Sequence, residues 1–254
     1  MGSPLSDAIR IVPVYGAGAL AEPAHGVAPA APPRLVYGGG PLLGAVEVVT
    51  VFLGAWWEAR QGAELAADLN DFFDFVLTSA LIDQLAEYDV PGTAIGHGRR
   101  VGTQTIGTWA AAASVADQTV RQTLQRAIAD GTLPPASPVR LYFLYLPPGV
   151  AVVEGGGRSC QAFCGYHDDI DGHVFYAVMP YPGCRGCGGG MALLDALTTT
   201  TSHELCEAIT DPVPGTGWYD EVHGEIGDIC AWQTKRLGVY AVQREWSNLE
   251  GSCI

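Results

Sequence analysis

A helix-forming segment near the C-terminus carries a histidine and two glutamates at metal-binding spacing. The segment, residues 191–210, reads MALLDALTTTTSHELCEAIT and includes His203, Glu204 and Glu207. Four residues are about one helical turn, so His203 and Glu207 project from one face and one metal ion could contact both. Glu204 lies about 100° further around the helix, where it can reach a water molecule on the metal without binding the metal. The spacing predicts a metal centre with Glu204 as the general base.

The second metal-binding position of this motif departs from the zinc metalloprotease signature. That signature is His-Glu-x-x-His on a helix, whereas here the last position is Glu207. A carboxylate can bind zinc, but its negative charge should acidify a bound water less and loosen the preference for zinc. We therefore expect Zn²⁺ and leave other divalent metals open.

An acidic stretch just after the helix offers the third ligand that a catalytic metal site needs. Residues 217–230 read GWYDEVHGEIGDIC, with Glu225 and Asp228 three residues apart. This spacing resembles the gluzincin arrangement, in which a downstream glutamate binds the metal and a nearby aspartate orients the first histidine. We expect Glu225 to be the ligand, with Asp228 orienting His203 or replacing Glu225. Tyr219 or His223 could donate a hydrogen bond to the oxyanion.

The motifs HELCEAITDP, GWYD and GEIGDIC together resemble the plant phosphate-induced (EXORDIUM-like) family and its bacterial relatives. The likeness continues upstream through residues 37–57 and the CGYH of 164–167, so it extends from about residue 37 to the C-terminus. It implies an exported, zincin-like protein that binds metal through His203, Glu207 and Glu225 or Asp228. It implies less about the reaction, because the plant members are discussed as cell-wall and growth proteins.

The elements around these motifs predict an α+β fold with a mixed β-sheet in a single zincin-like domain. The stretch 154–190 is rich in cysteine and glycine and is predicted to be mostly loop. Residues 1–34, rich in Gly, Ala and Pro toward their end, are predicted to be a leader or flexible segment before a domain spanning 35–254. Hydrophobic patterns predict strands at 45–53, 101–114, 139–146 and 173–180, and helices at 59–85 (one or two), at 117–129 with Asp117 as its cap, and at 191–210.

The seven cysteines favour disulfides over a structural metal site. Cys160, Cys164, Cys184 and Cys187 could hold zinc through four thiolates, but disulfides suit an exported protein with Gly-rich loops better. A pairing of Cys230 with Cys253 is a reasonable guess. The odd count leaves one thiol unpaired, and Cys206 on the helix is the candidate, packed as a small hydrophobic residue.

A second polar cluster, YHDDIDGH, occupies residues 166–173. It includes two histidines, His167 and His173, and three aspartates, whose carboxylates could bind Ca²⁺ at a second site or line the cleft. A solvated turn before the strand at 173–180 is the favoured interpretation.

Charge and hydropathy restrict the partners and the location. Asp and Glu number 27 against 13 Lys and Arg, a net charge of -14, and the bases are scattered. Nucleic acid and anionic membranes are therefore poor partners. No apolar run reaches the roughly 20 residues that span a bilayer, and no intact signal peptide is seen. We expect a secreted protein whose partner is a peptide or protein substrate.

Two functions follow as hypotheses. The first is a secreted, metal-dependent hydrolase, most simply a metallopeptidase, in which Glu204 deprotonates the attacking water. The alternative is a non-catalytic extracellular or cell-wall-associated binding protein whose metal is structural. A fourth protein ligand, such as His223 or Asp228 beside Glu225, would favour the alternative.

Overall fold

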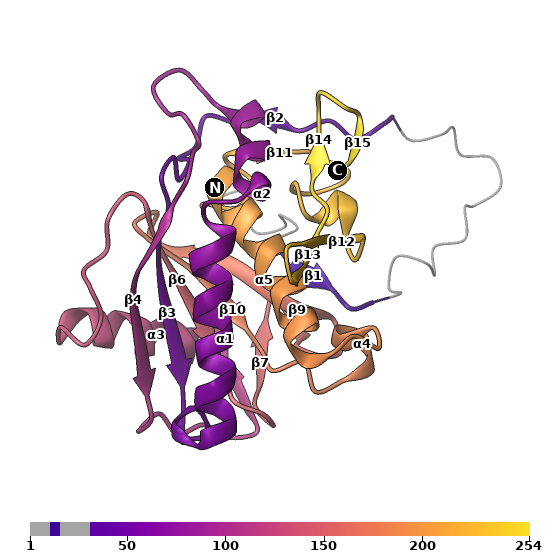
Figure 1. Cartoon of the computed structure of the whole chain (residues 1–254). Helices are drawn as coiled ribbons and strands as arrows, with labels where there is room; N and C mark the ends of the chain where they lie inside the picture. Colours follow the sequence, from indigo (N-terminus) through magenta and orange to yellow (C-terminus); the bar gives the residue numbers. More distant parts are fainter. Residues whose placement is uncertain (1–10, 16–30) are drawn as a thin grey trace.

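The computed structural model describes residues 11–15 and 31–254, which build around a six-stranded mixed β-sheet (Figure 1). Four neighbouring strands run parallel, β9 is antiparallel to β10, and β1 is antiparallel to β9. In sheet order the strands are β1 (Ile11–Pro13), β9 (Phe163–Ile170), β10 (Val174–Met179), β6 (Arg140–Tyr145), β3 (Glu47–Leu53) and β4 (Arg99–Ile106). The mixed α+β fold with a mixed sheet agrees with the sequence prediction.

The central strands are buried on both faces because their apolar residues are nearly continuous. β3 reads EVVTVFL and β6 reads RLYFLY, and all but the first residue of each is buried. Successive side chains of a strand point to opposite faces. Accordingly Val48 and Phe52 belong to one hydrophobic core, while Val49 and Val51 belong to the other.

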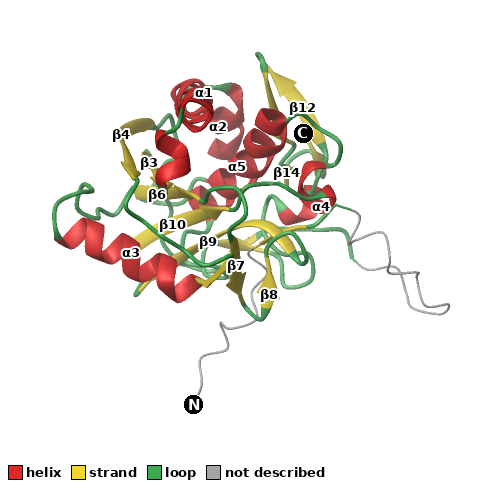
Figure 2. Cartoon of the chain, turned by 90° about the horizontal axis from the view of Figure 1, so that it is seen from below, coloured by secondary structure: helices red, strands yellow, loops and turns green. Residues whose placement is uncertain are grey.

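Helices cover both faces of the sheet (Figure 2). On one side lie α1 (Arg60–Val76), α2 (Ala80–Gln84) and α5 (Leu193–Thr210), and on the other lies α3 (Asp117–Ala129). α1 connects β3 to β4, and α3 lies in the connection from β4 to β6, so each helix serves a parallel crossover. We call the two sides the α5 face and the α3 face.

Short elements complete the described chain. They are β2 (Val36–Tyr37), η3 (Ala55–Glu58), η4 (Leu85–Tyr88), β5 (Ser114–Ala116), β7 (Ala151–Glu154), β8 (Gly157–Arg158), α4 (Arg185–Gly188), β11 (Trp218–Tyr219), η5 (Asp228–Cys230), β12 (Thr234–Leu237), β13 (Tyr240–Gln243), β14 (Trp246–Ser247) and β15 (Ser252–Cys253). The hairpin of β12 and β13 packs against α5.

Element boundaries differ from the prediction in two places. Of the one or two helices predicted at 59–85 the structure has two, separated at 77–79, where the Ser79 side chain accepts a hydrogen bond from Leu81 N and caps α2. The strand expected at 101–114 ends at Ile106. Asp117 begins α3 but does not cap it, because its carboxylate accepts hydrogen bonds from the hydroxyls of Tyr166 and Tyr176 instead.

Part of the predicted leader joins the sheet. Val12 pairs with Gly165 of β9 and is 1% exposed, and the Pro13 carbonyl accepts a hydrogen bond of 2.7 Å from Trp232 Nε1. This short strand is therefore part of the folded body, contrary to the leader prediction. The rest of the predicted leader up to residue 30, at 1–10 and 16–30, lies outside the described residues.

Three disulfides join the six cysteines other than Cys206, which is free and buried. The favoured interpretation of the cysteines is confirmed, including the pairing of Cys230 with Cys253, so the four-thiolate zinc site is excluded. The bonds are Cys160–Cys184, Cys164–Cys187 and Cys230–Cys253. Such bonds are typical of an oxidising compartment. Among the described residues, no helix has both the length and the apolar character needed to cross a bilayer.

Candidate metal centre

α5 is buried almost all round although its sequence is rich in threonine. Every residue from Ala196 to Thr210 is buried. The hydroxyls are satisfied locally: Thr198 donates to Ala241 O over 2.7 Å, and Ser202 Oγ accepts from Gln243 N over 2.9 Å. Because buried hydroxyls with partners cost little, the helix can lie between the sheet, α1 and the β12–β13 hairpin.

The motif on α5 adopts the arrangement expected from its spacing. His203 Nε2 lies 2.8 Å from Glu207 Oε1, and both side chains have no exposed surface. Glu207 Oε1 also accepts a hydrogen bond of 3.1 Å from Asp228 N. The other oxygen, Glu207 Oε2, has no hydrogen-bond partner. The helix therefore presents an imidazole and a half-satisfied carboxylate side by side.

Residues 217–230, which we call the return loop, bring Glu225 close to His203 and Glu207. Asp228 makes hydrogen bonds within this loop. Asp228 Oδ2 accepts a hydrogen bond of 3.1 Å from Glu225 N, while Asp228 Oδ1 lies 3.9 Å from His203 Nε2. Both carboxylate oxygens of Glu225 are buried without a partner. Glu225 thus has free oxygens to offer a cation, and Asp228 stabilises the loop that carries it.

Two glycines allow this close packing. A Cβ at Gly227 would lie 2.9 Å from Glu207 Oε1 and from the His203 ring, and a Cβ at Gly165 would lie 2.8 Å from Thr200 Cγ2 and 3.2 Å from Glu204 Oε1. Such separations are shorter than van der Waals contact. The return loop and β9 can approach α5 only because these two positions lack a side chain.

His167, on β9, completes the group, and sequence reasoning missed it. Its Nδ1 lies 3.1 Å from Glu204 Oε2 and 3.5 Å from Glu207 Oε2, and its Nε2 lies 3.4 Å from Glu225 Oε1. His167 is fully buried, so the solvated-turn interpretation was wrong at this residue. Its neighbour Tyr166 faces the α3 side, and strand alternation turns His167 toward α5.

A signal for His167 was present in the sequence. FCGYHDDI forms one eight-residue strand, β9, inside the stretch that was predicted to be mostly loop. The CGYH motif was already part of the family resemblance, but its histidine was grouped with the acidic residues after it. Of the predicted cluster, residues 171–173 form the turn, where Asp171 has a φ of 55°.

The candidate calcium ligands separate when β9 forms. The buried Asp168 follows His167 and so projects to the α3 side, whereas the Asp169 carboxylate accepts a hydrogen bond of 2.5 Å from Gly172 N in the turn. Within residues 11–15 and 31–254, neither aspartate belongs to a group whose ligand atoms converge within 4.8 Å. The structure therefore gives no support to a calcium site there.

Tyr219 and His223, the predicted oxyanion donors, lie on β11 and in the segment that follows it. Tyr219 belongs to β11 and pairs with Val36 of β2. His223 Nδ1 lies 2.9 Å from Asp220 Oδ1 at the start of the return loop. In the described part of the chain, His223 belongs to no group of histidine, cysteine and carboxylate side chains whose ligand atoms converge.

Burial and mutual charge perturb the ionisation of the whole group. Burial raises the pKa of Glu225 well above its usual value and also raises that of Glu204. Burial likewise opposes ionisation of Glu207, but the charges of His203 and His167 outweigh it and lower its pKa to about 2. Burial opposes protonation of both histidines, yet the surrounding carboxylates raise their pKa values. We call the five side chains the metal group; they are His167, His203, Glu204, Glu207 and Glu225. Its three carboxyl groups outnumber its two imidazoles, so a cation would be favoured there.

The donor atoms fit a divalent cation. Buried atoms without a hydrogen-bond partner are costly, so several in one place need a common explanation. Within 4.8 Å of one another lie ligand atoms of His203, Glu204 and Glu207, and likewise those of His167, Glu207 and Glu225. Imidazole nitrogen and carboxylate oxygen are ligands of zinc and of other divalent metals. In this group, the buried atoms without a hydrogen-bond partner are His203 Nε2, Glu204 Oε1, Glu207 Oε2 and both carboxylate oxygens of Glu225.

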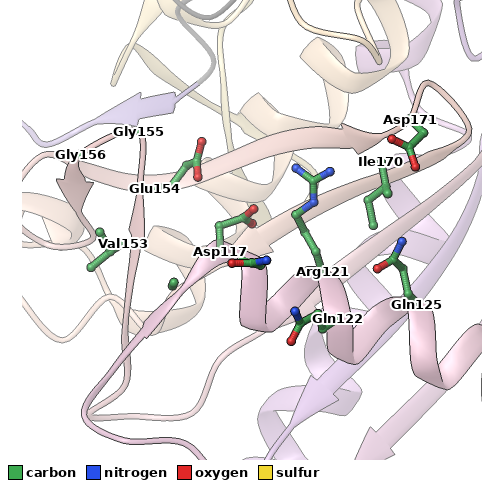
Figure 3. Close-up of a pocket in the computed structure, with 12 residues that line it drawn as sticks. Asp117, Arg121, Gln122, Gln125, Val153, Glu154, Gly155, Gly156, Ile170 and Asp171 are labelled. Atoms are coloured by element: carbon green, nitrogen blue, oxygen red, sulfur yellow. The ribbon is translucent and has the colours of Figure 1, made fainter.

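A separate pocket of about 560 Å³ lies over the α3 face (Figure 3). Arg121 and Gln125 line it from α3, and Glu154 lines it from the end of β7. None of the five side chains of the metal group contributes to it. The pocket is therefore not an entrance to that group.

No family model matches the chain, and no match was found among curated proteins or solved structures.

Proposed function

We propose that the protein is a metal-dependent hydrolase, with zinc as the first candidate metal and peptides as the substrate class. The observation that supports the proposal is the meeting of four buried carboxylate oxygens without hydrogen-bond partners, from Glu204, Glu207 and Glu225, beside two buried histidines at a His-Glu-x-x-Glu helix. Unpaired carboxylates are not stable in a dry interior, and a divalent cation would offset their charge. Glu207 belongs to both converging groups and is the common ligand in the proposal.

Glu204 is suited to the role of general base. Its Oε2 is held by His167 at 3.1 Å, while its Oε1 has no partner in the described chain and is free to take a proton from water. Burial raises the pKa of Glu204 above its usual value, and a raised pKa makes a carboxylate a stronger base. The bound metal would supply Lewis acidity, polarising the scissile carbonyl and acidifying water.

Secretion and the zincin-like character also belong to this proposal. Three disulfides favour an oxidising, extracellular setting. The resemblance to EXORDIUM-like proteins, carried by HELCEAITDP and GEIGDIC, points in the same direction. A peptide or protein substrate suits a secreted hydrolase of this type, and the acidic chain makes nucleic acid an unsuitable partner.

The proposal is tested by elemental analysis of the purified protein together with a peptide-library cleavage screen. We expect one transition metal per chain and cleavage that a chelator abolishes and added zinc restores. A protein that contains no metal and gains none on dialysis against zinc would refute the metal assignment. Stoichiometric metal without cleavage of any library member would refute the hydrolase assignment.

One observation favours a second candidate, a structural metal in a non-catalytic protein. All five side chains of the group have 0% exposure, and His167 adds a donor to those expected from the motif. A structural site is typically closed by four protein ligands, whereas a catalytic site keeps one position open. If this candidate is correct, chelation lowers the melting temperature strongly and no hydrolysis is measurable in the metal-loaded protein.

A further inference from the structure

The ring of His203 is held from behind by a buried glutamine. Gln243 Nε2 lies 2.8 Å from His203 Nδ1. Gln243 ends β13, is 0% exposed, and its backbone N–H donates to Ser202 Oγ on α5. The β12–β13 hairpin therefore reaches the metal group through one amide side chain.

Two further contacts determine which way this amide points. Trp232 N–H donates to Gln243 Oε1 over 2.9 Å, and Gln243 Nε2 donates to Gly227 O over 2.9 Å. Turning the amide over would lose both bonds and place two carbonyl oxygens in contact. An N–H of Gln243 therefore faces His203 Nδ1, and this ring nitrogen must accept.

A neutral imidazole that accepts at Nδ1 carries its proton on Nε2. His203 Nε2 lies 2.8 Å from Glu207 Oε1, so the proton on Nε2 is in electrostatic contact with this carboxylate. In this tautomer Nε2 has no lone pair to give to a metal. The glutamine contact therefore argues against His203 as a metal ligand, although the motif spacing favours it.

His167 shows the opposite arrangement. Its Nε2 lies 3.1 Å from the carbonyl oxygen of Asp211, a group that can only accept, so Nε2 carries the proton. The lone pair of His167 Nδ1 then faces Glu204 Oε2 at 3.1 Å and Glu207 Oε2 at 3.5 Å. In this neutral tautomer three electron-rich atoms face one another, and a proton or a cation between them would relieve their repulsion. Metal-binding histidines usually donate their other N–H to a carbonyl or carboxylate in this way.

We propose that His167, through Nδ1, is the nitrogen ligand of the cation, together with Glu207. Gln243 is a positioning residue that keeps the proton of His203 on Nε2, where it orients Glu207. The inference rests on the metal binding of the proposed function, but it does not depend on hydrolysis.

NMR of the full-length, ¹⁵N-histidine-labelled protein loaded with the spin-active cadmium isotope tests the ligand assignment directly. We expect one-bond cadmium–nitrogen coupling to His167 Nδ1 and none to His203, with resonances assigned through His167→Gln and His203→Gln. Coupling to His203 Nε2 would overturn the inference and leave metal binding intact. Absence of any cadmium binding would overturn the metal assignment and the ligand assignment together. The metal-free spectra separately report whether His203 is protonated at Nε2.

Zinc affinity, measured by competition with a chromophoric chelator, gives an independent comparison. Removal of a group that orients a ligand typically costs about 10- to 100-fold in affinity, so His203→Ala should fall in that range and His167→Ala should lose more. Circular dichroism identifies any variant that fails to fold. A larger loss in His203→Ala than in His167→Ala would contradict the assignment.

The role of Gln243 is tested by the nearly isosteric variant Gln243→Glu. Its carboxylate can only accept, so the His203 proton should move to Nδ1 and Nε2 should become available, giving cadmium coupling at both histidines. Gln233→Glu makes the same change at an exposed position of the neighbouring segment and should leave the spectrum unchanged. An unchanged His203 spectrum in Gln243→Glu would remove Gln243 from this role.

Discussion

At the scale of single residues, the site joins carboxyl groups whose pKa values shift in opposite directions. Glu207 is held ionised by two histidines, while Glu204 and Glu225 resist ionisation because they are buried. The same structural unit therefore contains a carboxylate suited to binding a cation and one suited to exchanging protons.

Glu204→Gln should separate binding from chemistry. The amide removes the base, so hydrolysis should fall by about 10²- to 10⁴-fold, the usual contribution of a general base. Metal content should stay at one per chain, since Glu207 and Glu225 are untouched. Elemental analysis and peptide cleavage measure the two effects. Glu221→Gln, on the exposed part of the return loop, is the matched control and should change neither. Undiminished turnover in Glu204→Gln would exclude the base role.

The metal-free protein should lose stability as pH rises. Glu204, Glu225 and His167 have raised pKa values in the folded state, so they bind more protons than they do in the unfolded chain. Their stabilising contribution is complete below their unfolded pKa values and is lost as pH rises through the folded values. A cation replaces those protons. Chelator should therefore lower the melting temperature more at about pH 8 than at about pH 5; an equal or reversed difference would contradict the assigned shifts.

The contribution of Glu207 to stability changes with pH in the opposite direction. Its pKa falls from 4.5 to about 2 on folding, so its contribution is complete above the unfolded value and is lost as pH falls toward about 2. In Glu207→Gln this contribution is absent. We expect the variant to lose less stability than the parent between about pH 4.5 and pH 2, as measured by urea unfolding.

At the scale of elements, the site depends on how closely three segments approach α5. β9 supplies His167, the return loop supplies Glu225, and the β12–β13 hairpin supplies Gln243. The approaches of β9 and of the loop each depend on a glycine facing α5. Glycine is needed at these two positions because the neighbouring atoms lie too close for a Cβ to fit, and not because a turn requires a positive φ.

Gly227→Ala should disturb the return loop. The added Cβ would meet the His203 ring and Glu207 at 2.9 Å, and overpacking of this kind costs about 1 to 3 kcal/mol. We expect the loop to shift, with a lower urea midpoint and weaker zinc binding. Gly96→Ala, where nothing lies within 4 Å of the new atom, is the control and should keep the parent affinity. Parent stability and affinity in Gly227→Ala would show that the loop is not tightly packed.

The sequence predicted the elements more reliably than their boundaries. The α5 helix follows from a long apolar pattern that Asp211-Pro212 ends, and β3, β6 and β10 follow from apolar runs. β9 was missed because FCGYHDDI is polar at the positions that face the metal group. A strand whose buried face is made of a histidine and glycine has no hydrophobic alternation to detect.

At the scale of the whole molecule, disulfides connect the site to the ends of the fold. Cys230–Cys253 joins the return loop to the last strand, while Cys160–Cys184 and Cys164–Cys187 join β9 and the segment before it to the α4 region. The metal group lies between the sheet and these cross-linked segments. The position of the metal group therefore depends on segments that the disulfides join from different parts of the described chain.

Replacing Cys230 and Cys253 by alanine should weaken both folding and metal binding. The bond closes a loop of 23 residues, and loss of such a bond costs about 2 to 4 kcal/mol. Because Cys230 lies two residues after Asp228 and five after Glu225 in the return loop, zinc affinity should fall as well. The matched pair, Cys160→Ala with Cys184→Ala, should cost similar stability while affecting affinity less. Equal affinity losses in the two double variants would show that the disulfide of the return loop matters no more for zinc binding than Cys160–Cys184 does.

The sequence by itself determined what local periodicity encodes. His203 and Glu207 share a helix face because the helix repeats every 3.6 residues, and an odd number of cysteines leaves one unpaired. Only the tertiary structure decided that His167, 37 residues before Glu204, completes the group, that Asp228 accepts a hydrogen bond within the loop, and that Gln243 lies against the His203 ring. These contacts depend on which strand lies beneath α5 and which hairpin lies behind it. Such pairings are set by packing across the whole fold, and no local pattern of residues carries them.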